Sequence, residues 1–278
     1  MLQKKPLPRP SLSLVLHPED DPSYRHFEDA LSVPFDATPS AFSRINAWWL
    51  ADAALLSYWR PEIARRIYSD QASLESVPIQ RLDTQAYVAW NHAFALVAFR
   101  GTQPDSVVDV LTDALVGQKE WDMAGECVHA GFLEALDVVW DQVVDALTPL
   151  GNRPVWFTGH SLGAALATLA GDRFQRQRQV RGFGELGGIY TFGSPLVGNR
   201  AFVDGFNGRC LDRSFRFVND QDVVPRLPPP LLGYRHVNTE RFVGFNDPNV
   251  IIDEPLIDHT PRRYAVLVWN ALVDAMVA

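Results

Sequence analysis

The fold is decided by one stretch of the chain, Val155-Trp-Phe-Thr-Gly-His-Ser-Leu-Gly-Ala-Ala-Leu-Ala167. Residues 155–158 form a short apolar run that predicts a buried strand, and the alanine-rich residues 162–177 predict a helix that can approach a sheet closely. The GxSxG pattern between them predicts a tight strand-to-helix turn, in which Gly159 and Gly163 leave room for the backbone. Such a turn, a nucleophile elbow, presents Ser161 at the carboxyl end of the strand and over the helix N-terminus. A chance GxSxG in a glycine-containing loop is the alternative, but it would lack this strand and helix.

Strands and helices alternate on both sides of this stretch. Short apolar runs predict the strands, and apolar positions three and four residues apart predict the helices. The further strands are expected at 87–90, 94–99, 189–192 and 215–218, and the further helices at 45–58, from Pro61 onward, at 131–147 and at 264–276. This alternation predicts an α/β fold with a mostly parallel central sheet and helices on both faces.

The chain of 278 residues is long enough to bury a substantial core, and we expect a single domain over residues 40–278. Residues 1–39 contain seven prolines and no sustained apolar period. We therefore expect these residues to form a proline-rich N-terminal arm and not a second domain.

Charge and composition exclude several classes of protein. The net charge of −8 argues against a nucleic-acid partner, and two cysteines without a CxxC pair argue against a disulfide scaffold or a cysteine zinc site. No apolar run is long enough for a transmembrane segment or a signal sequence. We therefore expect a cytoplasmic protein, with secretion by another route or a trimmed leader as the alternative.

A serine hydroxyl needs a histidine to remove its proton and an acid to orient that histidine. In folds with a nucleophile elbow the chain order is serine, acid, histidine. The histidines that follow Ser161 are His236 and His259. We prefer His259, because it precedes the last predicted helix, with Thr260 as its N-cap and Pro261 at its first position. We place His236 in a strand and expect it to make a structural hydrogen bond.

The acid and the oxyanion hole follow from chain order and position. Asp220 and Asp222 come just after the strand predicted at 215–218, where site residues collect in open α/β sheets. We prefer Asp222, which is followed by Val-Val-Pro, and keep Asp220 as the alternative. The oxyanion needs two donors, and the backbone N–H of Leu162 next to the nucleophile is one of them. Thr102, just after an earlier predicted strand, is the candidate for the second.

Six blocks of sequence carry a family resemblance. They are Phe99-Arg-Gly-Thr102, Val128-His-Ala-Gly-Phe132, Gly159-His-Ser-Leu-Gly-Ala-Ala-Leu-Ala167, Tyr190-Thr-Phe-Gly-Ser-Pro195, Val197-Gly-Asn199 and Asp222-Val-Val-Pro-Arg-Leu-Pro-Pro229. In this order they resemble the class 3 lipases, the fungal-lipase-like branch of the α/β-hydrolases. The resemblance runs from about residue 43 to the final helix. It implies Ser161, Asp222 and His259 as the catalytic residues, and Thr102 with Leu162 as the oxyanion hole.

Some positions in these blocks depart from the family or carry no expected chemistry. His129 and His160 belong to the blocks, and we interpret both as structural. Ala164 stands where a second glycine is usual, inside the predicted helix. Leu196 replaces a common arginine and Val110 a common tryptophan, both near the expected substrate, so the resemblance leaves the acyl preference open.

The resemblance also implies a lid after Thr102. Apolar residues between Thr102 and Gly117 follow the spacing i, i+3, i+4, i+7, i+8 of an amphipathic helix. They are Val107, Val110, Leu111, Ala114 and Leu115. A surface helix packed permanently on the core is the alternative. We expect a short lid helix that covers an acyl groove when closed and contacts lipid when open.

The leading hypothesis is a serine hydrolase of lipid esters, of the triacylglycerol lipase type, that acts through an acyl-enzyme without metal or cofactor. Phospholipase A1, galactolipase or short-chain esterase activity on the same scaffold is the alternative. A catalytically inactive lipid-binding relative is the non-enzyme alternative, and it is disfavoured because every triad position holds a competent residue. The expected partner is a lipid or ester substrate, with transient contact to a lipid interface through the lid.

Overall fold

The computed structural model describes residues 2–8, 17–20, 23–39, 41–101, 117–123, 125–219, 221–237, 240–242 and 255–277. Three of the expectations above lie outside these residues: Thr102, Asp220 and the lid helix that follows Thr102.

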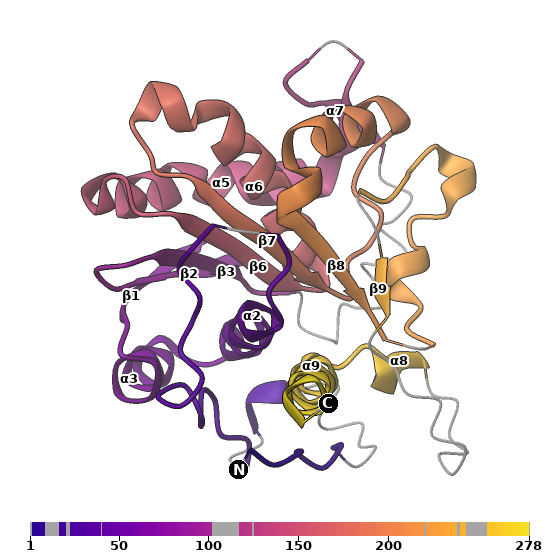
Figure 1. Ribbon diagram of the computed structural model, residues 1–278. Coiled ribbons are helices and arrows are strands. Elements are labelled where there is room, and N and C mark those ends of the chain that lie inside the picture. The colour runs from indigo at the N-terminus through magenta and orange to yellow at the C-terminus, as the bar shows by residue number, and fades with distance from the viewer. Residues whose placement is uncertain are drawn as a thin grey trace.

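Within the described residues a seven-stranded sheet runs through the middle of the molecule, in the order β1-β2-β3-β6-β7-β8-β9 (Figure 1). The strands are β1 (Glu75–Arg81), β2 (Thr84–Trp90), β3 (Ala95–Phe99), β6 (Val155–His160), β7 (Leu186–Phe192), β8 (Ser214–Val218) and β9 (Glu240–Phe242). β1, β2 and β3 are antiparallel neighbours, and each neighbouring pair from β3 to β9 is parallel. A separate hairpin pairs β4 (Gln118–Glu120) with β5 (Cys127–His129). The prediction of a mostly parallel α/β sheet is confirmed.

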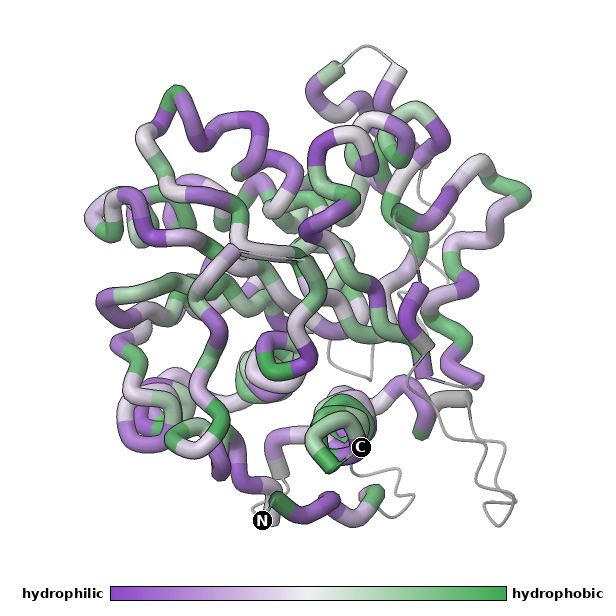
Figure 2. The backbone as a smooth tube through the Cα atoms, in the orientation of Figure 1, coloured by the Kyte–Doolittle hydropathy of each residue, from purple (hydrophilic) through white to green (hydrophobic). Residues whose placement is uncertain are grey.

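Helices cover both faces of this sheet (Figure 1). One face carries α2 (Arg44–Leu56), α3 (Pro61–Ala72) and α9 (Pro261–Val277), with the single-turn α8 (Pro255–Asp258) before α9. The other face carries α5 (Ala130–Leu147), α6 (Leu162–Arg181) and α7 (Arg200–Cys210). Hydrophobic residues gather in the sheet and in the helices packed on it, as the hydropathy colouring in Figure 2 shows. Each face therefore has its own core: Trp48 packs on Trp269 on one side, and Phe157 on Phe174 on the other.

The described part of residues 1–39 packs on the side of the molecule that carries α2 and α9. Phe35 is buried and stacks on Phe94, with 4.1 Å between the ring centroids. Closer to the N-terminus, the backbone N–H of Lys5 donates to the side-chain oxygen of Asn270 at 2.8 Å. Residues of the proline-rich arm thus contribute to the same core as the two helices.

The direction of the strands determines where a site can form. β6, β7 and β8 are parallel, so their carboxyl ends meet at one edge of the sheet. Ser161 directly follows β6, and Asp222 lies four residues beyond the end of β8. The crevice beyond the carboxyl ends of parallel strands is where ligands bind in open α/β sheets.

Candidate active site

The turn between β6 and α6 forces Ser161 into a strained backbone conformation. Its φ of 59° and ψ of −128° lie outside the regions that side-chain-bearing residues normally adopt. A Cβ at Gly159 would lie 2.2 Å from the carbonyl oxygen of Gly163, and a Cβ at Gly163 would lie 2.3 Å from the carbonyl oxygen of Phe99. Only glycine fits at either position, which is why GxSxG marks this turn in the sequence.

Three side chains from distant parts of the chain form a continuous hydrogen-bonded series. The Oγ of Ser161 lies 2.8 Å from Nε2 of His259, and Nδ1 of His259 lies 2.9 Å from Oδ2 of Asp222. All three are buried, with 3%, 5% and 1% of their surface exposed. The structure thus brings together the serine, the histidine and the aspartate that the sequence analysis preferred.

The carboxylate of Asp222 fixes the protonation pattern of the series. An ionised carboxylate only accepts hydrogen bonds, so Nδ1 of His259 carries the proton and donates it to Asp222. Nε2 is then a free base, and it accepts the hydroxyl proton of Ser161. The arrangement can therefore take a proton from Ser161 and hold the resulting imidazolium against a buried negative charge.

Asp222 is held by two further donors. The hydroxyl of Tyr264 donates to Oδ2 at 2.6 Å, and the backbone N–H of Val224 donates to Oδ1 at 2.9 Å. Burial and the charge of Asp222 raise the pKa of Tyr264 well above its ordinary value, so this hydroxyl stays protonated and remains a donor. The backbone N–H of Asn219 donates in turn to the oxygen of Tyr264 at 3.0 Å. Both oxygens of the acid are thus oriented before any substrate binds.

The loops that carry the acid and the base are tied to each other through Asp258, the neighbour of His259. The side-chain amide of Asn219 donates to the carbonyl oxygen of Asp258 at 2.8 Å, and the backbone N–H of Gln221 donates to its carboxylate at 3.2 Å. Arg263, in the first turn of α9, pairs with the same carboxylate at 3.1 Å. These contacts hold the loop that carries His259 at a fixed position relative to the loop that carries Asp222.

Of the two oxyanion candidates, the structure describes Leu162 but not Thr102. Leu162 is the first residue of α6, directly after Ser161, so its backbone N–H is one of the unpaired donors of a helix N-terminus. Thr102 lies outside the described residues, but Gly101 before it is described. A Cβ added to Gly101 would lie 3.2 Å from the Cβ of Ser161, so the chain passes beside the nucleophile just before Thr102.

The second histidine considered in the sequence, His236, lies apart from this series. Its Nε2 donates to the carbonyl oxygen of Pro225 at 2.5 Å, and burial together with nearby Arg216 lowers its pKa to about 3. The structural hydrogen bond was expected. The strand around it was not correctly placed, since the described residues there form only an isolated bridge at Arg235.

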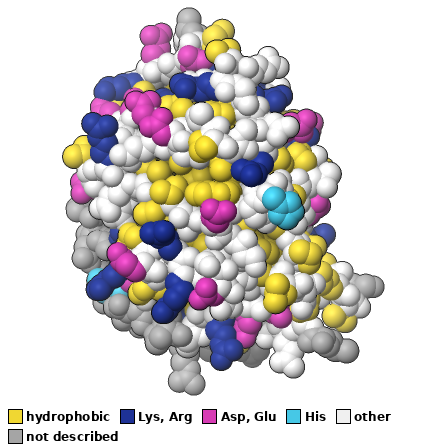
Figure 3. Space-filling model, turned by 90° about the vertical axis from the view of Figure 1, so that its left-hand side faces the viewer, with side chains coloured by type: hydrophobic (Ala, Val, Ile, Leu, Met, Phe, Trp, Pro, Cys, Tyr) yellow, Lys and Arg dark blue, Asp and Glu magenta, His cyan; other side chains and the backbone are white. Residues whose placement is uncertain are grey.

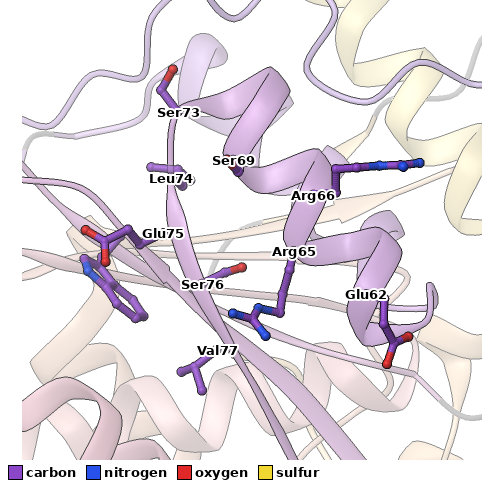
Figure 4. A pocket seen from close by; sticks show the side chains of 10 residues that line it. Glu62, Arg65, Arg66, Ser69, Ser73, Leu74, Glu75, Ser76 and Val77 are labelled. Carbon is purple, nitrogen blue, oxygen red and sulfur yellow. The ribbon is translucent and has the colours of Figure 1, made fainter.

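A pocket of about 910 Å³ lies elsewhere, between α3 and the edge strand β1. Figure 4 shows Arg65 extending from α3 toward β1, whereas Arg66 points away. Glu75, at the start of β1, pairs with Trp90 of β2, at the opposite end of the sheet from the elbow. Figure 3 views this side of the molecule and shows hydrophobic side chains in the middle of the face with charged groups around them. The pocket contains none of the residues of the Ser161 series.

Sequence reasoning missed three residues at the site: Asn219 and Tyr264 contact Asp222, and Tyr58 contacts His160 next to the nucleophile. Tyr58, Asn219 and Tyr264 reach the site from the end of α2, the end of β8 and the first turns of α9. A tyrosine in an apolar helical pattern looks like an ordinary core residue. Asn219 offered the one local signal, because a polar side chain directly after a buried strand lies at the site edge.

Taken together, an elbow serine, a histidine and an aspartate at the carboxyl edge of a mostly parallel sheet define an α/β-hydrolase. Residues 96–232, about half of the chain, match the family model of the class 3 lipases. The chain belongs to the class 3 lipase family, as the sequence blocks indicated.

Individual relatives agree with this assignment. The chain is 36% identical over 162 residues to secreted mono- and diacylglycerol lipase 1 of Fusarium solani, covering 56% of this chain and 46% of that protein. It is 30% identical over 200 residues to a lipase of Rhizopus niveus, covering 69% of this chain and 50% of the other. The chain thus spans about half the length of the curated relatives it matches.

Solved structures show the same fold. Lipase II from Rhizopus niveus superposes with a TM-score of 0.61 at 27% identity, over 73% of this chain and 83% of that one. A triacylglycerol lipase whose catalytic centre is described as a serine protease triad superposes with a TM-score of 0.63 at 25% identity, over 79% and 94%.

The comparisons correct the expected location. Relatives from Fusarium solani, Penicillium cyclopium and Malassezia restricta are named as secreted lipases, so the prediction of a cytoplasmic protein is wrong. That prediction depended on the lack of a signal sequence in the chain, which carries no information about a precursor. Among the described helices, none combines the length and the apolar character needed to cross a bilayer.

Proposed function

We propose that this chain hydrolyses carboxylic esters of lipids, with Ser161 as the nucleophile, His259 as the general base and Asp222 as the acid that orients it. The observation that carries the proposal is the unbroken series from Ser161 Oγ through His259 to Asp222, at 2.8 and 2.9 Å. These distances are within the range at which a base removes a proton directly.

In the acylation step, Ser161 Oγ attacks the ester carbonyl carbon while His259 Nε2 takes the hydroxyl proton. The carbonyl electron pair moves onto its oxygen, where the backbone N–H of Leu162 and a donor at Thr102 stabilise it. The intermediate then collapses, the C–O bond to the alcohol breaks, and His259 returns the proton to the leaving oxygen. His259 then takes a proton from a water molecule, whose oxygen attacks the acyl carbon. The bond from the acyl carbon to Ser161 Oγ breaks, Oγ takes the proton back from His259, and the carboxylic acid is released.

Lipid esters are the proposed substrate class. Relatives that share this chain's family are named as triacylglycerol lipases or as mono- and diacylglycerol lipases, several of them secreted. We propose an extracellular enzyme of the same kind, with the amphipathic segment after Thr102 as a lid that meets a lipid interface. Phospholipase A1, galactolipase and short-chain esterase activity are the alternatives on the same catalytic series.

A substrate panel tests this proposal. Initial rates are measured on emulsified triacylglycerol and diacylglycerol, on phospholipid and galactolipid vesicles, and on p-nitrophenyl esters of graded chain length. A lipase gives the highest rates on the acylglycerols, with a rise above proportionality when substrate exceeds its solubility limit. Turnover confined to soluble short-chain esters would make the chain an esterase. No turnover on any ester would contradict the proposal and favour the alternative of a catalytically inactive lipid-binding relative.

A further inference from the structure

A second series of hydrogen bonds runs behind the nucleophile and does not include Ser161. Nε2 of His160 lies 2.6 Å from the backbone carbonyl oxygen of His259, and Nδ1 of His160 lies 2.9 Å from the hydroxyl of Tyr58. Gly101 lies against the Tyr58 hydroxyl, since a Cβ added to Gly101 would lie 2.2 Å from the hydroxyl oxygen. We call the two hydrogen bonds of His160, together with this contact, the Tyr58–His160 relay.

The direction of every bond in the relay follows from its last acceptor. A carbonyl oxygen only accepts, so Nε2 of His160 carries a proton and donates it to His259. Nδ1 of a neutral imidazole is then an acceptor, and it takes the hydroxyl proton of Tyr58. A proton on Nδ1 would instead leave the bare Nε2 facing the carbonyl oxygen of His259, two acceptors buried against each other, which fixes the tautomer of His160.

The surroundings of His160 keep it neutral. Its side chain is 3% exposed, and its ring lies 4.5 Å from the ring of His259 and 5.7 Å from that of Tyr264, between centroids. Burial, and then the nearby His259, lower the pKa of His160 well below its ordinary value. A charged His160 would also repel the imidazolium that His259 becomes during the reaction.

The relay connects three parts of the site that are far apart in the sequence. Tyr58 lies just past the end of α2, His160 is the last residue of β6, and His259 stands before α9. Gly101, at the far end, passes beside Ser161 and leads directly into Thr102. The backbone of the base and the chain that leads to the oxyanion candidate are thus fixed relative to one another through His160.

We propose that Tyr58 and His160 are positioning residues for ester hydrolysis, which set the place of His259 and of the Gly101 backbone relative to Ser161. This inference rests on the function proposed above. It assigns a specific role to a histidine that the sequence analysis treated as merely structural.

Kinetics of matched variants test the relay. Tyr58→Phe and His160→Leu each break it, and Tyr87→Phe is the control. The buried Tyr87 hydroxyl donates to the carbonyl oxygen of Trp59 at 2.8 Å and, within the part of the chain that the structure describes, has no bond to the site. On a soluble p-nitrophenyl ester we expect kcat to fall about 10- to 100-fold in the first two variants, with KM within about twofold. Tyr87→Phe should keep the wild-type kcat.

A conservative replacement separates positioning from packing. His160→Gln places an amide N–H near the position of the imidazole Nε2, so it can still donate to the carbonyl of His259. We expect it to recover most of the kcat that His160→Leu loses. The proposal is overturned when Tyr58→Phe is as active as Tyr87→Phe, or when His160→Gln is no better than His160→Leu.

A readout independent of turnover completes the test. Nitrogen-15 NMR of the histidine side chains should show His160 with a protonated Nε2 and a bare Nδ1, unchanged from pH 5 to pH 9. A proton on Nδ1, or titration within that range, overturns the relay even in an active enzyme. A wild-type chain without ester turnover overturns the proposed function instead, so the two failures are distinguishable.

Discussion

Two buried aspartates in this molecule have opposite surroundings. Asp172, in the middle of α6, and Asp222, after β8, are 0% and 1% exposed. Asp172 accepts hydrogen bonds from the guanidinium groups of Arg176 at 2.7 Å and Arg209 at 2.8 Å, and from the indole of Trp121 at 2.8 Å. The negative charge of Asp172 is therefore permanently neutralised by two arginines on the same side of the sheet.

Asp222 has no such cation among the described residues. Its partners are the His259 imidazole, the Tyr264 hydroxyl and the Val224 backbone N–H. Positive charge reaches this carboxylate when His259 takes the proton of Ser161, which is the moment at which the reaction needs stabilisation. The comparison teaches that a carboxylate paired with arginines stabilises the fold, whereas one left with neutral donors can stabilise a transient charge.

The largest effects are expected at the Ser161 series. Replacing Ser161, His259 or Asp222 by alanine should each lower kcat about 10³-fold or more, because the three act as a unit. The loss at Asp222 should be the smallest, since it orients and stabilises but transfers no proton. Rates on a soluble ester, with circular dichroism as the folding control, measure this. Near-native turnover in Ser161→Ala would contradict the proposed mechanism.

At Asp172 we expect the effect to fall on stability and not on turnover. Asp172→Asn removes one of the two buried carboxylates that Arg176 and Arg209 share, the other being Glu126, and breaking a buried ion pair typically costs about 3 kcal/mol. The urea midpoint should fall accordingly, while kcat per folded molecule stays at the wild-type level. If kcat fell as far as in Asp222→Ala, it would be wrong to assign Asp172 to stability and Asp222 to catalysis.

The smallest effect concerns His236, whose pKa in the fold is about 3. In the unfolded chain it has the ordinary value of about 6.5, so below that pH the unfolded state binds a proton that the folded state does not. The stability from the neutral imidazole is therefore complete above pH 6.5 and is lost as the pH falls toward 3. The slope from this residue approaches about 1.4 kcal/mol per pH unit.

His236→Gln should flatten that slope and leave kcat at pH 8 within about twofold of wild type. Urea unfolding between pH 6 and pH 4, compared with wild type, measures the difference. A total loss of turnover in a folded His236→Gln chain would instead make His236 the base.

The elbow could be predicted from the sequence because its physical constraint is local. The close approach of Gly159 and Gly163 to neighbouring backbone admits no side chain, so the glycines mark the turn directly. Chain order then limited the base to two histidines, and the position just after a predicted strand singled out two aspartates as candidates for the acid. The parallel sheet could be predicted because short apolar runs, which indicate strands, alternate with segments whose apolar residues are three and four positions apart, which indicate helices.

Other elements left no such mark. β1 contains Pro78 and was not predicted, yet among the described strands it lies at the edge of the sheet and pairs with β2 alone, and there a proline is tolerated. α7 contains Gly205 and Gly208, which weaken a helical pattern. The contact of Tyr58 with His160 joins residues 102 positions apart, and no local pattern encodes such a pairing.

The most direct test of the account is to identify the residue that reacts covalently. The purified chain is treated with a p-nitrophenyl phosphonate, which releases nitrophenol as the serine oxygen bonds to phosphorus, and the adduct is mapped by mass spectrometry. We predict one adduct per chain, on Ser161, with labelling strongly slowed in His259→Ala and complete loss of ester turnover after labelling. An adduct on another residue, or undiminished turnover in the fully labelled chain, would contradict the account.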